Sequence, residues 1–466
     1  MHPTWNILGL ADWIEQLKVM REQSFETMRL LSVAWLIAPS PQLITTALVY
    51  SGLSRQHHAK FYRLFSQACW SVDDMAEALA RALVDAFVPK GELHVIFDDT
   101  LCHHPGYSIA ATGCHIDPVR SSKSYKVKAY GHVWLIAALR LQFPFSPRPF
   151  TLPIAFRLYR TQADCEATGE VFRKKTELAE ELMVQLAGWF PRRRIRLCVD
   201  NAYFCTQLLQ NRPHNVDIIG RLKANTVLRT ATPPTTQGTG QAGRPRKQGH
   251  LLPTLPEIYA DDQKYPWHQG SVDGYRHPRE VSYKSFSAQW YPSNGPSLMR
   301  VVIVKMTNGT EPFRVYASTR RHDRGRDVLC DYAGRWSIEV TNRDLKQDLG
   351  FGASGVRNAR SVARLAPFVG CLFSIVVAWY AQHGVGSEHD WLPLRPWDTD
   401  KTAPAFCDML AAAQHAIRAE GIFPEYGQHD FPRNCRPPWH ALENPTQRNP
   451  DQHEQRQSSQ GEKVAA

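Results

Sequence analysis

The stretch LHVIFDDT (residues 93–100) joins an apolar run to two consecutive aspartates. A run of this length is typical of a strand that is covered on both faces of a sheet. The stretch IRLCVDN (195–201) has the same form and contains Asp200. An ionised carboxylate that directly follows a buried strand is costly unless a backbone donor, an arginine or a cation compensates it. For each aspartate alone, a cap on the following turn is the ordinary explanation; two such strand ends together with a third carboxylate would predict a site.

The sequence around these two strands predicts an α/β fold. Residues 131–143 (GHVWLIAALRLQF) are another candidate strand, and residues 166–190 have a helical pattern that precedes the strand at 195–199. Strands that alternate with helices are typical of this fold class. Residues 201–330 contain short strand-like runs, so we expect a mainly β insertion there. Within it, the Pro-, Gly- and Thr-rich residues 231–250 predict a flexible basic loop.

Residues 1–90 have a helical pattern throughout. Ser71, followed by Asp73 and Asp74, predicts the start of the last helix in this segment. The stretch SRQHHAKFYRLF (54–65) mixes basic and aromatic residues, which suits a helix that faces DNA. An ordinary amphipathic helix explains that stretch about as well.

Composition and charge limit the kinds of protein that this sequence can encode. The formal net charge of +11 favours a polyanionic partner. Ten cysteines occur, none of them in a CxxC pair, and no secretory signal opens the chain, so we expect reduced thiols in a cytoplasm. Residues 365–380 are apolar but fall short of a typical membrane span and contain Pro367. They predict a buried core helix, and we expect no membrane association.

The stretch DYAGRWSIEVTNRDLKQ (331–347) predicts one helix with a charged face. At about 100° per residue, a hydroxyl, a guanidinium, a carboxylate and an ammonium fall within about 60° of one another. These groups belong to Tyr332, Arg335, Glu339 and Lys346. Ile338 and Leu345 point roughly the other way, toward a buried side. The ordinary explanation of such a face is a set of solvated ion pairs at helical spacing.

Asp98, Asp200 and Glu339 are three candidate oxygen ligands. Carboxylates that leave space for water and phosphate are the usual way in which proteins hold Mg²⁺. Two such ions, about 3.5–4 Å apart, activate an oxygen nucleophile and stabilise the leaving oxygen in phosphodiester cleavage. Three convergent carboxylates would therefore suit a metal-dependent nuclease.

The helix at 331–347 has the spacing Tyr-x2-Arg-x3-Glu-x6-Lys. This spacing resembles the signature of one branch of the DDE transposases of bacterial insertion sequences. DDT (98–100) resembles the first aspartate motif of that family, and VDNAYF (199–204) resembles the second. The likeness covers roughly residues 90–385. It implies a ribonuclease-H-like α/β core with a mixed sheet and flanking helices. It also implies that the catalytic metal ligands are Asp98, Asp200 and Glu339, which would hold two Mg²⁺ ions that Mn²⁺ could replace.

Asp99 competes with Asp98 for the first position of this triad. The resemblance favours Asp98, because the family motif is an aspartate followed two places later by Thr or Ser. Strand alternation points the two side chains to opposite faces, so only one of them can join the site. We therefore assign Asp98 and keep Asp99 as the alternative.

The resemblance also implies contacts with DNA. Tyr332, Arg335 and Lys346 would contact phosphates near the transposon end, because cations and hydroxyls bind phosphate oxygens. Arg343 lies on the same helix face and either joins these contacts or pairs with a nearby acid. Trp336 either stacks on an unpaired base at the DNA terminus or fills the core.

The flexible loop carries a further basic motif, GRPRK (243–247). With Arg244 and Arg246, it resembles the core of an AT-hook, whose Arg-Pro segment lies in a narrow minor groove. A basic flexible loop is the alternative, and either would add nonspecific affinity for DNA.

Together these features predict five segments along the chain. They are a helical DNA-end-binding domain (1–90), the first part of the catalytic core (91–200), a β-rich insertion (201–330), the C-terminal part of the core (331–385) and a loop-rich region with a disordered tail (386–466).

The expected function is that of a bacterial, cytoplasmic transposase. It would bind the terminal inverted repeats of its element as at least a homodimer, cut the double-stranded DNA and join the freed 3′-hydroxyl to target DNA. A ribonuclease-H-like nuclease without strand transfer is the alternative enzyme, and a catalytically silent DNA-binding protein is the alternative from another class. All three motif carboxylates are present, which argues against the silent protein.

Overall fold

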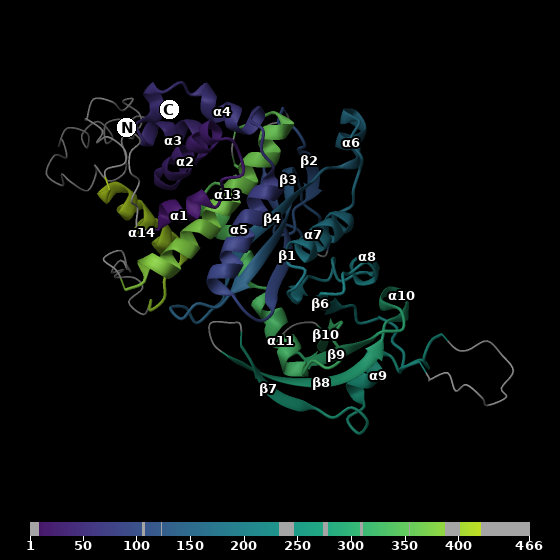
Figure 1. Ribbon diagram of the computed structural model, residues 1–466. Helices are drawn as coiled ribbons and strands as arrows, with labels where there is room; N and C mark the ends of the chain where they lie inside the picture. The colour runs from purple at the N-terminus through teal and green to yellow at the C-terminus, as the bar shows by residue number, and fades with distance from the viewer. Residues whose placement is uncertain are drawn as a thin grey trace, which may run out of the picture. The chain divides into compact units, whose positions relative to one another are not determined.

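Within the described residues, ten strands form one mixed sheet in the computed structural model of the protein (Figure 1). The structure describes residues 9–104, 108–122, 124–232, 247–273, 278–307, 311–353, 355–386 and 401–420. The strands are β1 (Leu93–His103), β2 (Gly113–Ile116), β3 (Lys128–Leu141), β4 (Phe150–Tyr159), β5 (Ile195–Cys198), β6 (Val216–Leu222), β7 (His268–Val272), β8 (Arg279–Gln289), β9 (Leu298–Lys305) and β10 (Phe313–Ser318). Their order is β2-β3-β1-β5-β6-β10-β9-β8-β7, and β4 also pairs with β3.

The centre of the sheet is parallel and its two sides are antiparallel. β5 pairs in parallel with both β1 and β6, whereas β3 and β10 pair antiparallel with β1 and β6. The predicted α/β class with a mixed sheet is therefore confirmed. β6 comes from the segment 201–330, so the first strand of the predicted β insertion is part of the same sheet as β1 and β5.

β1 is longer than the sequence predicted. It continues through Asp98 and Asp99 to His103, because β3 pairs with it antiparallel as far as Gly131. The expectation that the strand ends at Asp98 is therefore wrong.

The helices are α1 (Leu10–Glu15), α2 (Glu22–Ile37), α3 (Ile44–Tyr50), α4 (Ala59–Ser66), α5 (Val72–Phe87), α6 (Gln162–Thr168), α7 (Lys175–Trp189), α8 (Thr206–Gln210), α9 (Leu255–Ala260), α10 (Tyr291–Asn294), α11 (Gly325–Gly334), α12 (Ser337–Asp348), α13 (Ala359–Trp379) and α14 (Phe406–Ala419). Short helical turns follow α3 (Leu53–Arg55) and α13 (Tyr380–Gly384). The helical pattern predicted for the N-terminal segment is confirmed for its described residues. Ser71 caps α5 as predicted, since its side chain accepts a bond from the backbone N–H of Asp74 (3.2 Å).

α13 is a core helix, as predicted from its apolar sequence. It packs against β4 and against the N-terminal helices α1, α4 and α5 (Figure 1). With the following turn (Ala359–Gly384) it is long and apolar enough to cross a membrane, yet 94% of its most apolar window is buried inside the protein. A Cβ at Gly370 would lie 2.2 Å from the ring of Phe156 on β4, so glycine permits this close packing.

The stretch 331–347 forms two helices, and the prediction of a single helix is wrong. The guanidinium of Arg140 on β3 donates to the backbone carbonyl of Asp331 (3.0 Å). In an unbroken α-helix, that carbonyl would accept from the N–H of Arg335. This N–H donates instead to the carbonyl of Tyr332 (3.1 Å), so a turn with i→i−3 hydrogen bonds, in which Arg335 and Trp336 keep helical backbone angles, separates α11 from α12.

The C-terminal region contains a helix that the sequence did not predict. α14 packs against α2, where Gln414 donates to the carbonyl of Leu36 (2.8 Å). Phe406 at its start stacks on Phe373 of α13, with ring centroids 4.0 Å apart. Residues 401–420 therefore differ from the expected loop-rich region, and the predicted tail beyond them lies outside the described residues.

Candidate active site

Asp98 and Asp200 come from neighbouring parallel strands. β1 and β5 pair with each other as far as Ile96 and Cys198, and each aspartate lies two residues further along the chain. The register therefore brings the two aspartates to the same edge of the parallel part of the sheet.

Asp200 also caps the turn that follows β5. Its Oδ1 accepts hydrogen bonds from the backbone N–H groups of Ala202 (2.8 Å) and Tyr203 (3.1 Å). The turn cap that the sequence analysis gave as the ordinary explanation of Asp200 is therefore present. A turn cap fixes the orientation of a carboxylate, so it is compatible with a role in a site.

Asp98 and Asp99 point to opposite sides of β1, as strand alternation predicts. Asp98 faces α12, where the side-chain amide of Asn342 donates to its Oδ2 (3.0 Å). Asp99 faces α7 and the turn after β5, where it accepts from Lys175 Nζ (2.5 Å) and from the hydroxyl of Tyr203 (3.1 Å). Of the two neighbours, Asp98 is the one that contacts the helix carrying Glu339.

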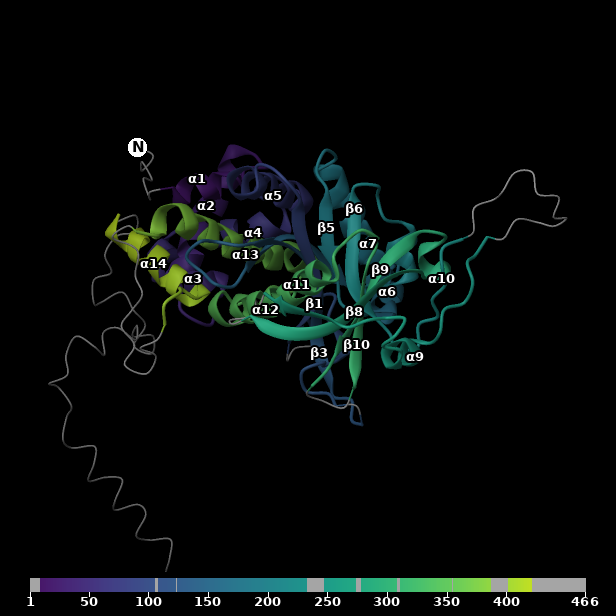
Figure 2. The same cartoon turned by 90° about the horizontal axis from the view of Figure 1, so that it is seen from below.

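Arg335 links Asp98 to Glu339. Its guanidinium lies 2.7 Å from Glu339 Oε1 and 3.6 Å from Asp98 Oδ1, and its side chain is only 16% exposed. It also lies over the ring of Tyr332, 5.7 Å from the ring centroid. The charged face predicted from the sequence therefore turns inward at Arg335, toward the carboxylates, and Figure 2 shows α12 beside β1.

The electrostatics of Asp98 show that negative charge gathers around it. Burial raises the pKa of Asp98 to about 7; the charge of Arg335 opposes this rise, and the charges of Asp99, Asp200 and Glu339 add to it. Near neutral pH the protonated and ionised forms of Asp98 therefore have comparable populations. The charge of Arg335 therefore does not offset the combined effect of burial and of the neighbouring carboxylates on the pKa of Asp98.

The donor chemistry fits a hard divalent cation, although the ligands are not gathered into one cluster. Asn342 Oδ1 is buried without a hydrogen-bond partner next to Asp98, and oxygen donors with excess negative charge are what Mg²⁺ prefers. Among the described residues, however, no three His, Cys, Asp or Glu side chains lie close enough to hold one ion. In this arrangement Glu339 pairs with Arg335 and is 46% exposed.

Three other members of the predicted charged face have protein partners. The ring of Tyr332 lies against that of Tyr316, with centroids 4.5 Å apart, and burial raises the pKa of Tyr332 to about 12. Lys346 Nζ donates to the carbonyl of Leu101 on β1 (2.8 Å). Arg343 pairs with Asp344 (2.8 Å), which is the ion-pair alternative considered for it.

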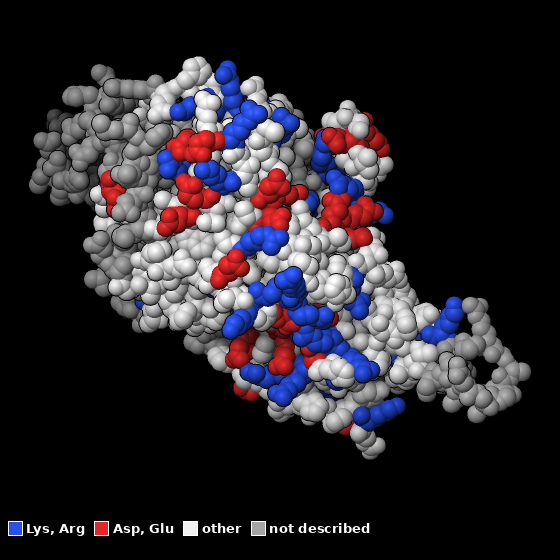
Figure 3. Space-filling model, viewed as in Figure 1, with Lys and Arg blue, Asp and Glu red and all other residues white. Residues whose placement is uncertain are grey.

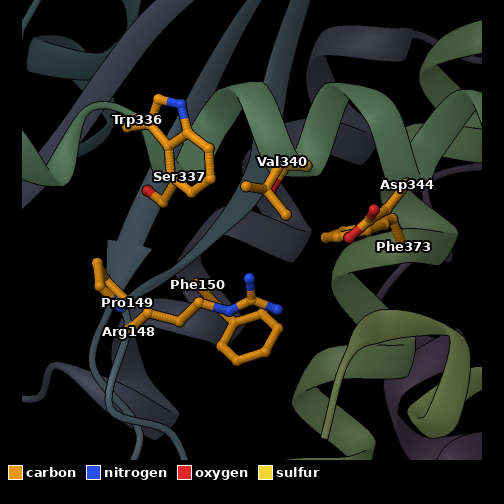
Figure 4. Close-up of a pocket in the computed structure, with 9 residues that line it drawn as sticks. Arg148, Pro149, Phe150, Trp336, Ser337, Val340, Asp344 and Phe373 are labelled. Carbon is orange, nitrogen blue, oxygen red and sulfur yellow. The ribbon is translucent and has the colours of Figure 1, made fainter. Parts of the chain in front are cut away.

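Trp336 does not fill the core, because it is 47% exposed. It borders a pocket between α12 and the chain that enters β4 (Figure 4). Trp336 and Val340 lie on one side of this pocket, and Arg148, Pro149 and Phe150 lie on the other. An exposed indole beside an arginine can accept a flat ring, so base stacking remains open to it. The basic loop residues Arg244 and Arg246 lie outside the described residues.

Sequence reasoning did not find Asn342, Lys175 or Tyr203. For Asn342 a signal was present: at about 100° per residue it falls about 20° from Arg335 on the same helix face. For Lys175 and Tyr203 no sequence signal exists, because their contact with Asp99 depends on how α7 and the turn after β5 pack on β1.

A buried ion network supports the turn between α11 and α12. Asp331 pairs with Arg140 (2.7 Å) and with Arg196, and Arg196 also pairs with Asp323 (2.8 Å). Burial alone would raise the pKa of Asp331, but the hydrogen bond from His94 and the charges of the two arginines hold it well below its usual value. The network ties α11 to β1, β3 and β5, and so fixes where α12 begins.

Comparison with known families identifies the chain. Residues 37–278 match the DDE superfamily endonuclease family, which is more than half of the sequence. The chain belongs to that family. The match to the DDE superfamily endonucleases includes Asp98 and Asp200 and ends before α11, so the role of Glu339 depends on residue spacing and on the contacts of α12. A nuclease is the enzyme class that this family indicates. A search of curated proteins found no match.

Proposed function

We propose that this DDE superfamily endonuclease is a DNA transposase. It would bind the terminal inverted repeats of an insertion sequence, cleave the DNA by two-metal-ion hydrolysis and transfer the 3′-hydroxyl end to target DNA. The observation that carries the proposal is the pair of contacts that Asp98 receives beside Glu339. Asn342 donates to it from α12, the helix that bears Glu339, and Arg335, which lies just before α12, pairs with both carboxylates. The Tyr-x2-Arg-x3-Glu-x6-Lys spacing on α11 and α12 supports the specific transposase branch.

Asp98, Asp200 and Glu339 would hold two Mg²⁺ ions, which Mn²⁺ could replace. When bound there, such ions would activate the attacking water and stabilise the leaving oxygen. Asn342 would keep Asp98 oriented through the bond to Oδ2. Arg335 now pairs with Glu339 and lies 3.6 Å from Asp98, so it is the cation best placed to pair with a phosphate at this edge.

The proposed reader of the terminal repeat is the N-terminal helical segment. On α4 the buried side holds Phe61, Leu64 and Phe65, and the exposed side holds Tyr62 and Arg63. The apolar residues thus form the amphipathic helix, and the remaining aromatic and basic side chains face solvent, where DNA could bind.

The net charge of +11 supports a polyanionic partner but does not locate it. On the face in Figure 3, basic side chains lie beside acidic ones, and this view shows no continuous basic surface. We propose at least a homodimer, because two element ends must be brought together, and a bacterial cytoplasm as its location.

The direct test is incubation of the protein with labelled DNA that carries the ends of its own element, a target plasmid and Mg²⁺. Cleavage at the element boundary and a joined product are expected, and EDTA should abolish both. Asp98→Ala, Asp200→Ala and Glu339→Ala should each abolish cleavage while end binding is retained. A protein that binds the ends but never cuts them would contradict the proposal.

A nuclease without strand transfer is the second candidate. It is favoured by the family match, which indicates endonuclease activity alone. The same incubation separates the two functions, since such a nuclease would release cut ends and yield no joined product.

A further inference from the structure

Asp99 is the acidic neighbour of Asp98 that the proposed reaction leaves unused. We propose that Asp99 is a positioning residue, which holds the turn carrying Asp200 in place through Tyr203. The inference rests on the proposed function, in which Asp200 is a metal ligand. It gives the two consecutive aspartates of the DDT motif separate roles, one on each side of β1.

A short chain of contacts joins Asp99 to Asp200. The hydroxyl of Tyr203 donates to Asp99 Oδ1 (3.1 Å), and the backbone N–H of Tyr203 donates to Asp200 Oδ1 (3.1 Å). Tyr203 is 1% exposed, so packing fixes its ring. The turn that carries Asp200 is therefore held at a fixed position relative to β1. One residue therefore ties both carboxylates together.

Lys175 makes Asp99 a stable anchor. Its Nζ lies 2.5 Å from Asp99 Oδ2, while Oδ1 accepts from Tyr203, so each carboxylate oxygen has a donor. Lys175 is the first residue of α7, and the positive end of a helix dipole also favours a carboxylate nearby. An aspartate engaged in this way is a poor candidate for a metal ligand, in contrast to Asp98, which lies beside an unpartnered oxygen of Asn342.

Packing holds the other side of the same turn. Phe204 stacks on Trp290, with ring centroids 6.1 Å apart, and contacts Gly220 of β6 so closely that a Cβ there would lie 2.4 Å from the ring. The turn is thus clamped between β6 and β1, and the Tyr203 hydroxyl is its polar link to β1. Because a displacement of about 1 Å in a reacting group can cost about a hundredfold in rate, this link should matter for cleavage.

The test compares Tyr203→Phe, Asp99→Ala and the double variant, with Tyr259→Phe on α9 as the matched control. Tyr203→Phe removes one hydroxyl and keeps the ring, so it should fold. We expect it to reduce the cleavage rate by about 10–100-fold and to raise the Mg²⁺ concentration needed for half-maximal rate, with end binding unchanged. Asp99→Ala should have a similar effect, and the double variant should be no worse than the stronger single variant.

A second measurement does not depend on cleavage. Amide hydrogen exchange in the metal-free protein should be at least about tenfold faster at Ala202 and Tyr203 in the Tyr203→Phe variant, while amides of α13 keep their protection. Asp99→Asn retains a carbonyl acceptor for the tyrosine but loses the ion pair with Lys175, so its protection and its activity should lie between those of the wild type and of Asp99→Ala.

The outcomes distinguish a failure of the proposed transposase function from a failure of the positioning role of Asp99. If the wild type does not cleave DNA, the proposed function fails, and the exchange data still decide the positioning role. Unchanged exchange in Tyr203→Phe would overturn the role of Asp99. So would an inactive Asp99→Asn protein combined with a fully active Tyr203→Phe protein, because Asp99 would then be the catalytic carboxylate.

Discussion

Asp98 combines burial with like-charged neighbours, and its pKa is raised to about 7. In an unfolded chain the pKa of an aspartate is about 3.9. Between these two values the folded protein binds more protons than the unfolded chain, so its free energy of unfolding falls as pH rises through this window. Asp98→Asn should remove that loss. At pH 8 the variant should be more stable than the wild type by an amount of order 1–4 kcal/mol, and below about pH 4 the difference should vanish.

Denaturant unfolding between pH 4 and 8 in EDTA measures this difference. Asp85→Asn, at an exposed position on α5, is the control and should follow the wild type at every pH. A less stable Asp98→Asn protein at pH 8 would show that Arg335 compensates Asp98 fully and that no excess negative charge gathers there.

Asn342 supplies the hydrogen bond that favours the ionised form of Asp98. In Asn342→Ala this donor is lost, so the pKa of Asp98 should rise further. Because a metal ion binds the ionised carboxylate, the midpoint of the pH–rate profile for Mg²⁺-dependent cleavage should move up by about one unit. A lower rate with an unchanged midpoint would assign Asn342 a role that does not act through Asp98.

At the scale of single elements, sequence patterns predicted the strands and helices that can be recognised from the residues of the segment itself. The apolar runs of β1, β3 and β5 and the cap at Ser71 could be read directly. The extension of β1 through Asp98 could not, because it depends on pairing with β3, whose Ile136 pairs with Asp98 from 38 residues further along the sequence. The edge strands β2 and β7 were missed because short, partly exposed strands have weak patterns.

The break between α11 and α12 was also beyond a local pattern. At this point the carbonyl of Asp331 accepts from the guanidinium of Arg140, which comes from β3, and we infer that this contact causes the break. The same distinction holds for the candidate site. Spacing indicated Asp98, Asp200 and Glu339, but it could not show that Arg335 lies between two of these carboxylates.

The turn between α11 and α12 depends on Gly334. A Cβ at this position would lie 2.2 Å from Arg140 Nη1, which is too close for the guanidinium to keep its bonds to Asp331. Gly334→Ala should therefore displace a buried charge and lower the free energy of unfolding by about 2–4 kcal/mol. Gly188→Ala on α7 is the matched control: a Cβ there meets nothing within 4 Å, so the variant should be neutral or slightly stabilised. Equal stability of the two variants would remove Arg140 as the cause of the break.

At the scale of the whole molecule, the N-terminal helices and the sheet share one apolar core through α13. α1, α4 and α5 all contact α13, and Arg364 of α13 donates to the carbonyls of Phe65, Ala68 and Trp70 next to α4. A fragment that starts at residue 91 would expose this side of α13. We expect it to aggregate or to unfold without a cooperative transition, as measured by thermal melting and gel filtration. A soluble fragment that melts cooperatively would show that the helical segment is an independent domain.

Because deletion of that segment would disturb the core, its proposed DNA contacts are best tested at its surface. Tyr62 and Arg63 are exposed on α4, next to the buried Phe61 and Leu64, so Tyr62→Ala and Arg63→Ala should leave thermal melting unchanged. If α4 reads the element end, Arg63→Ala should weaken end binding and reduce the salt dependence of binding by about one unit of slope for the lost phosphate contact. Tyr62→Ala should weaken binding to the element end more than binding to unrelated DNA.

Lys18→Ala is the matched control for lost positive charge. Lys18 is exposed, pairs with Glu22 at the start of α2, and is not part of α4. It should show the affinity and the salt slope of the wild type. If the α4 variants and the control bind element ends equally well, recognition belongs to another surface of the chain, and the exposed aromatic and basic residues of α4 are only the solvated side of an amphipathic helix.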